Sequence, residues 1–130
     1  MLRSATKLQI ENWIKEADDL LSRGDVVQAS EKYYKAAEEA IKLLTINLGL
    51  KDILNTAKES GWDLATLHKA VTEICKKLNN EDIFEYWESA IVLLTVENLS
   101  LDVVKDEAEN VRKLVKISDE IANRELDKRS

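Results

Sequence analysis

The chain contains no proline, three glycines and a single cysteine in 130 residues. Proline breaks helices because it lacks a backbone N–H, so its absence leaves each segment free to run as an uninterrupted helix. The lone cysteine, Cys75, excludes an internal disulfide framework and a Cys-rich metal site. Because Cys75 falls on an apolar stripe, it is predicted to be a small buried core residue.

Long hydrophobic runs are also absent. No stretch approaches the roughly 18 apolar residues that a membrane-spanning helix needs. Residues 1–19, MLRSATKLQIENWIKEADD, lack the continuous apolar segment of a signal peptide. These absences predict a cytoplasmic protein with no membrane partner.

Positive charge is in deficit, with 19 Lys and Arg against 25 Asp and Glu and a net charge of −6. A broad nucleic-acid-binding surface needs clustered Lys and Arg, so this balance argues against one. Hydrophobic residues make up 45% of the chain and charged residues 34%, which is typical of a folded domain rather than a disordered one. The length predicts a single domain over residues 1–130, with a core at about 5–123 and a short polar tail at 124–130.

The glycines separate segments in which apolar residues recur every three or four positions, the period of a helix. Gly24, Gly49 and Gly61 are each predicted to end a helix. Asp25 and Asp63 follow two of these glycines and are predicted N-caps. Further along the chain, Ser100 is the predicted N-cap of the last helix.

Each segment has one apolar face, so the helices are expected to enclose a common core. The faces consist of Ile10, Trp13, Ile14, Ala17, Leu20 and Leu21; Val26, Ala29, Tyr33, Ala36, Ala37, Ala40 and Leu44; Leu64, Leu67, Val71, Ile74, Cys75 and Leu78; Phe84, Trp87, Ile91 and Leu94; and Val104, Ala108, Val111, Val115 and Ile121. The predicted fold class is all-α, an up-and-down bundle of about five long helices plus one short helix near residues 50–60.

One segment, residues 90–99, is apolar on two sides. If the face with Phe84, Trp87, Ile91 and Leu94 is turned inward, the opposite side carries Val92, Leu93 and Val96. Leaving these side chains in water forgoes about 1.5–3 kcal/mol each if a partner covers them. We therefore predict a homodimer interface at Val92, Leu93 and Val96. The alternative is a helix enclosed on both sides within its own monomer.

A stretch around the first glycine, RGDVVQASEKYYKAAEEAI, resembles a tetratricopeptide unit at its Gly-Asp turn and at Ala29, Tyr33 and Ala36. Tetratricopeptide arrays need stacked copies about 34 residues apart, and their repeats commonly carry a proline. This chain has no proline and no clear second copy, and its second helix is predicted to run to about Leu48. A tetratricopeptide-like adaptor is therefore a secondary hypothesis.

Three longer stretches are similar to the archaeal PaREP family within the HEPN class of small helical domains. They are ADDLLSRGDVVQASEKYYKAAEEAIKLLTINLGL (17–50), LHKAVTEICKKL (67–78) and ESAIVLLTVENLSLDVVKDEAENVRKLV (88–115). The features that carry the similarity fall on Gly24, Asp25, Ala29, Ser30, Ala36, Ala40 and His68. The resemblance covers roughly residues 10–121 and implies a HEPN-like bundle of four or five helices that is often a dimer.

The resemblance also bears on catalysis, because some HEPN members are RNases that use an Arg followed four to six residues later by a His. Here the only histidine, His68, has no Arg at those distances, and no His follows Arg112. Acid–base RNA cleavage usually relies on a group that titrates near neutrality, which His supplies. No catalytic residue is therefore predicted, and the chain is expected not to be an enzyme.

Five residues are candidate binding groups for RNA or a nucleotide phosphate: His68, Lys76, Lys77, Arg112 and Lys116. The competing interpretation is a packing histidine together with helix-end cations on a solvated face. No cluster has metal-ligand spacing, so no metal or cofactor is predicted. The predicted function is a non-catalytic interaction or nucleotide-associated module that acts as a homodimer, with another protein as a further partner. An RNA-binding protein or atypical RNase is the alternative.

Overall fold

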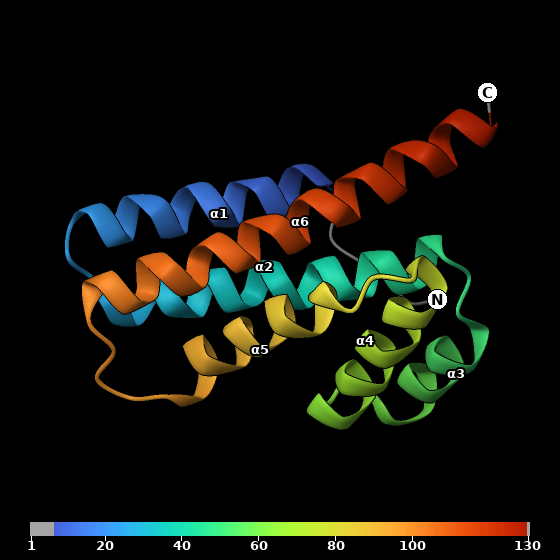
Figure 1. The fold of residues 1–130 in the computed structure, drawn as a ribbon, viewed down its shortest axis with the longest axis horizontal. Coiled ribbons are helices and arrows are strands. Elements are labelled where there is room, and N and C mark those ends of the chain that lie inside the picture. The colour runs from blue at the N-terminus through green and yellow to red at the C-terminus, as the bar shows by residue number, and fades with distance from the viewer. Residues whose placement is uncertain (1–6, 130) are drawn as a thin grey trace.

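The computed structural model describes residues 7–129, which form six α-helices and no strand (Figure 1). The helices are α1 (Lys7–Ser22), α2 (Val26–Asn47), α3 (Lys51–Ser60), α4 (Leu64–Leu78), α5 (Asp82–Thr95) and α6 (Leu101–Arg129). The predicted all-α bundle of five long helices and one short one is confirmed. Helix α6 continues through residues 124–129, which the sequence suggested as a polar tail.

The predicted helix ends lie at the glycines. At the end of α1, Gly24 has φ +80°, a left-handed conformation that glycine adopts without steric cost. The amide of Asp25 then donates to the carbonyl of Leu20 over 2.9 Å, which closes a Schellman motif. Helix α4 ends the same way on Asn79 (φ 50°) instead of a glycine.

The three predicted N-caps are confirmed. Asp25 Oδ1 accepts a 3.1 Å hydrogen bond from the amide of Gln28, and the Gln28 side chain donates to Asp25 Oδ2 over 2.6 Å. Asp63 Oδ1 accepts a 2.8 Å hydrogen bond from the amide of Thr66, and Ser100 Oγ accepts a 3.2 Å hydrogen bond from the amide of Val103. These bonds satisfy backbone donors that the first turn of a helix leaves without partners.

Removing the cap of the central helix tests this account of the helix ends. Asp25→Ala is expected to lower the free energy of unfolding by about 1 kcal/mol, because the first turn of α2 loses its acceptor. Urea unfolding followed by circular dichroism measures the change. Asp25→Ser keeps an acceptor and should recover most of the stability, whereas equal losses in both variants would argue against a capping role.

Helix α2 lies at the centre of the bundle and contacts all five other helices. Helices α1 and α6 run along it on one side, while α3 and α4 pack together near its C-terminal end (Figure 1). The close approach is possible because α2 carries fully buried alanines at positions 29, 36, 37 and 40. This arrangement is a bundle around one helix, not a stack of tetratricopeptide repeats.

The orientation of α5 differs from the prediction. Leu93, expected on the outward side, is only 4% exposed and belongs to the core, whereas Leu94, expected inward, is 43% exposed. The predicted place of Leu93 in an exposed interface is therefore wrong. The reason is that α5 contacts α2, α4 and α6 and buries a wider arc than one stripe, including the small residues Ser89 and Ala90. Cys75 is buried, as predicted.

Candidate functional site

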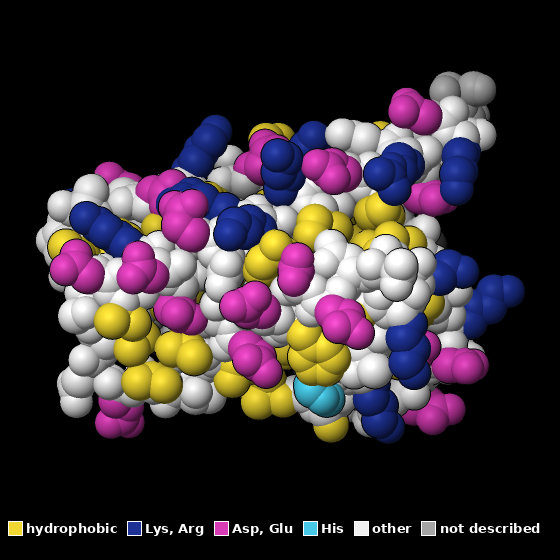
Figure 2. All heavy atoms as spheres, in the orientation of Figure 1, with side chains coloured by type: hydrophobic (Ala, Val, Ile, Leu, Met, Phe, Trp, Pro, Cys, Tyr) yellow, Lys and Arg dark blue, Asp and Glu magenta, His cyan; other side chains and the backbone are white. Residues whose placement is uncertain are grey.

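A mainly apolar depression of about 480 Å³ lies between the start of α4 and the outer side of α5. We call it the α4–α5 hollow. It is lined by Leu64, His68, Phe84, Trp87, Glu88, Ile91 and Val92. The histidine is visible among hydrophobic side chains at the lower edge of the face shown in Figure 2. Two predicted positions that are far apart in the sequence, His68 and Val92, thus meet in one hollow.

The side chain of His68 is exposed and packs against an aromatic ring. Its centroid lies 5.5 Å from that of Phe84, and the two planes make an angle of 73°, an edge-to-face arrangement. Glu88 lines the same hollow, so an imidazole and a carboxylate border a patch that is otherwise hydrocarbon. Within residues 7–129, no three His, Cys, Asp or Glu side chains are grouped so that they could hold a metal ion.

The other predicted interface residues lie elsewhere. Val96 follows the end of α5, is 49% exposed, and lines a different pocket that faces the start of α2. Of the three predicted residues, only Val92 therefore borders the hollow, where its side chain is half-buried.

Arg112 of α6 joins three helices. Its guanidinium holds Asp18 of α1 by two hydrogen bonds, one of them 3.1 Å from Nη1 to Oδ2, and the hydroxyl of Tyr33 in α2 donates to the same carboxylate over 2.5 Å. The guanidinium also lies 5.8 Å from the centroid of the Tyr33 ring. Partial burial alone raises the pKa of Asp18, but the hydrogen bonds from Arg112 and Tyr33 outweigh it and bring that pKa below its usual value of 3.8.

This network changes the interpretation of Arg112. Two of the five N–H donors of this guanidinium already bind the carboxylate that neutralises its charge, which makes Arg112 a poorer phosphate ligand than a free arginine. Burial and the hydrogen bond to Asp18 raise the pKa of Tyr33, so its hydroxyl stays protonated and donates. The cluster is thus best explained as a clamp between α1, α2 and α6. No pattern in the sequence connects Asp18 with either of these partners, which lie 94 and 15 residues away.

The predicted basic residues do not form one patch. Lys76 and Lys77 are exposed at the end of α4, where Lys76 pairs with Glu73 over 3.6 Å. Lys116 is exposed on α6, beside a small hollow that Arg112 also lines. Among the helices described, α4 and α6 make no contact, so the two groups of cations are separate.

That small hollow also contains Asp119, whose Oδ1 atom is buried without a hydrogen-bond partner. Burial raises the pKa of Asp119. Its charged form therefore destabilises the folded protein, and this loss of stability grows as pH rises above the usual pKa of 3.8. Asp119→Asn should therefore be more stable than the wild type at pH 7, by less than about 1 kcal/mol because solvent screens the partly exposed side chain, with no difference near pH 3. Thermal unfolding across this range measures it. Asp106→Asn, at an exposed carboxylate on the same helix, serves as the control, and a destabilised Asp119→Asn would contradict the account.

Comparison with known proteins places this architecture in a family. A sequence model described as the archaeal PaREP1/PaREP8 family matches residues 5–115. The chain belongs to the archaeal PaREP1/PaREP8 family. The predicted PaREP resemblance is confirmed, while the wider relationship to HEPN domains stays a prediction.

Solved structures share the PaREP fold. The crystal structure of a Sulfolobus solfataricus protein is 43% identical, with 87% of this chain and 95% of that one covered and a TM-score of 0.81. The solution structure of the Orf c02003 protein is 42% identical, with 91% and 92% covered and a TM-score of 0.77. No curated protein matches the chain. Among the described helices of this PaREP protein, none has the length and apolarity needed to cross a membrane.

Proposed function

We propose that this PaREP protein is a non-catalytic interaction module that acts as a homodimer through the α4–α5 hollow. The observation that carries the proposal is the exposed apolar surface there. Leu64 is 48% exposed, and the half-buried side chains of Phe84, Ile91 and Val92 continue the surface along α5. Contiguous apolar patches of this kind mark interaction sites on proteins in water.

A second copy of the chain is a suitable occupant because it brings the same apolar surface and the same two polar groups to the contact. In a two-fold dimer the same patch meets itself, so each group in it faces a group from the same set. The hollow offers one imidazole, His68, and one carboxylate, Glu88, beside the hydrocarbon surface. Antiparallel docking would bring His68 close to the partner subunit's Glu88, while the aliphatic side chains cover each other.

Charges placed in the hollow test the proposal. Leu64→Glu/Val92→Glu is expected to convert a dimer into a folded monomer, because four like charges then meet across the two-fold axis. Size-exclusion chromatography with light scattering measures the mass, and circular dichroism checks the fold. Leu8→Glu is the matched control, since Leu8 is 63% exposed on α1, away from the hollow. A monomeric wild type, or a double variant that stays dimeric, would defeat the proposal.

RNA binding remains the alternative hypothesis, and the exposed side chains of Lys76 and Lys77 at the end of α4 favour it. Labelled single-stranded RNA at low salt tests it directly. Binding that is lost in Lys76→Ala/Lys77→Ala would support the alternative. The absence of both binding and cleavage would remove it.

A further inference from the structure

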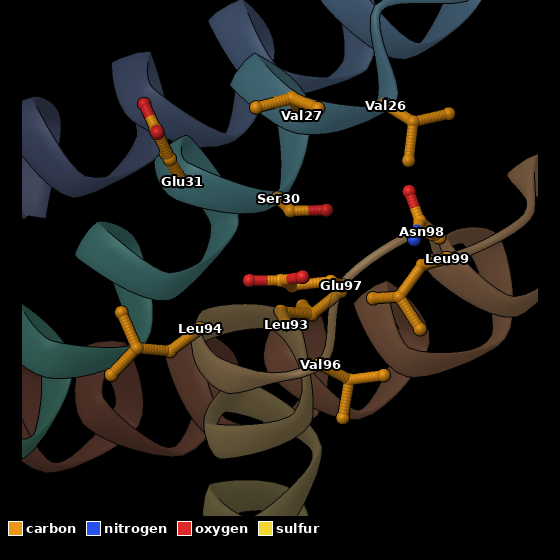
Figure 3. Close-up of a pocket in the computed structure, with 10 residues that line it drawn as sticks. All are labelled: Val26, Val27, Ser30, Glu31, Leu93, Leu94, Val96, Glu97, Asn98 and Leu99. Carbon is orange, nitrogen blue, oxygen red and sulfur yellow. The ribbon is translucent and has the colours of Figure 1, made fainter.

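A second concave site, independent of the α4–α5 hollow, lies between the first turns of α2 and the loop that follows α5 (Figure 3). Its volume is about 490 Å³, and we call it the α2–α5 pocket. Val26, Leu93 and Leu99 provide apolar surface on its walls. Its polar groups come from Ser30 of α2 and from the loop residues Glu97 and Asn98.

Ser30 distinguishes this pocket from an ordinary surface depression. The residue is only 6% exposed, and its hydroxyl oxygen has no hydrogen-bond partner. In Figure 3 the hydroxyl points into the space bounded by Asn98 and Glu97. Buried hydroxyls are nearly always hydrogen-bonded, so one aimed into a pocket indicates a group that binds there.

The charge of the pocket indicates the kind of group. The side chains of Glu97 and Asn98 form no hydrogen bond or ion pair within residues 7–129. Glu31 adds a second negative charge at the edge, and no Lys, Arg or His is among the lining residues. The helix N-terminus nearby would favour an anion, but the Asp25 carboxylate already caps it. The pocket therefore favours a cation.

We propose that the α2–α5 pocket binds a primary alkylammonium group. An ammonium has three N–H donors and no acceptor, which matches the Ser30 hydroxyl oxygen, the Glu97 carboxylate and the amide oxygen of Asn98. The carbon chain next to the ammonium packs on Val26, Leu93 and Leu99. The group comes either from a free diamine or from the lysine side chain of a protein, and the two sources share this chemistry.

Titration of the ¹⁵N-labelled protein with 1,6-diaminohexane tests the proposal by NMR. The expected result is saturable shifts of backbone amides in residues 26–31 and 93–99. The neutral isostere 1,6-hexanediol should bind at least ten-fold more weakly because it lacks the charge. Nα-acetyl-lysine methylamide distinguishes the sources, since tighter binding of this compound assigns a protein lysine and tighter binding of the diamine assigns a free amine.

Two variants test the individual groups. Ser30→Ala removes a buried hydroxyl that has no partner, so the fold should be retained while diamine affinity falls several-fold. Glu97→Gln should lower affinity at least ten-fold, and Glu59→Gln, at an exposed carboxylate on α3, should not change it. Equal binding of diamine and diol, shifts outside the pocket, or unchanged affinity in both pocket variants would overturn the proposal.

Discussion

Asp18→Ala is expected to lower the free energy of unfolding by about 2 kcal/mol at neutral pH. The substitution leaves the fully buried Tyr33 without an acceptor for its hydroxyl and leaves Arg112 without its counter-ion. The value is smaller than for a fully buried pair, because the side chains of Asp18 and Arg112 are 43% and 38% exposed and water screens them. Urea unfolding at pH 7 measures the loss.

The adjacent residue provides a control. Asp19 pairs with Arg23 over 2.9 Å, but both side chains are about two-thirds exposed, so Asp19→Ala should change stability by less than about 0.5 kcal/mol.

The contribution of Asp18 to stability also depends on pH, in a direction set by its pKa shift. Because the pKa of Asp18 is lower in the folded protein than in the unfolded chain, its contribution is present above about pH 4 and disappears as pH falls through the folded value. Equal effects of the two substitutions, or an effect of Asp18→Ala that does not decline as pH falls below about 4, would contradict the clamp.

Ala40→Leu is expected to cost about 2–3 kcal/mol of stability. Ala40 is fully buried on α2, the helix that contacts every other helix, and three added carbons have no space there unless the neighbouring helices move. The near-ultraviolet circular dichroism signal of the packed aromatic side chains should also weaken. Chemical unfolding and these spectra measure both effects.

The same substitution at an exposed position separates packing from helix propensity. Ala65 lies exposed near the start of α4, and Leu is nearly as good a helix former as Ala. Ala65→Leu should therefore change stability by less than about 0.5 kcal/mol. If Ala40→Leu also changed stability by less than about 0.5 kcal/mol, the idea that the alanines of α2 allow close helix packing would be wrong.

The number of helices and most of their ends could be predicted from the sequence because their causes are local. Gly24 ends a helix because it adopts the left-handed conformation. Asp63 begins one because its carboxylate accepts a hydrogen bond from the amide three residues later. Both effects act within one turn of the chain. The end of α4 at Asn79 was not marked by a glycine and had no equally clear signal.

The remaining features depend on contacts between distant helices. The face of α5 that turns toward the core is set by its contacts with α2, α4 and α6. The sequence of α5 alone does not contain this information, so the prediction placed Leu93 on the wrong side. The clamp joins Asp18 to Arg112, 94 residues away, through charged side chains that a helical pattern assigns to the surface. Similarly, the pairing of His68 with Val92 in one hollow follows from the packing of α4 on α5.

The central claim is that two copies of this PaREP protein meet at the α4–α5 hollow. An isotope-filtered NOE experiment on a 1:1 mixture of ¹³C-labelled and unlabelled protein tests it most directly, because it reports only contacts between copies. The account predicts intermolecular NOEs from the methyl groups of Leu64, Ile91 and Val92, and none from Leu8. No intermolecular NOEs, or NOEs only from methyl groups outside the hollow, would contradict it.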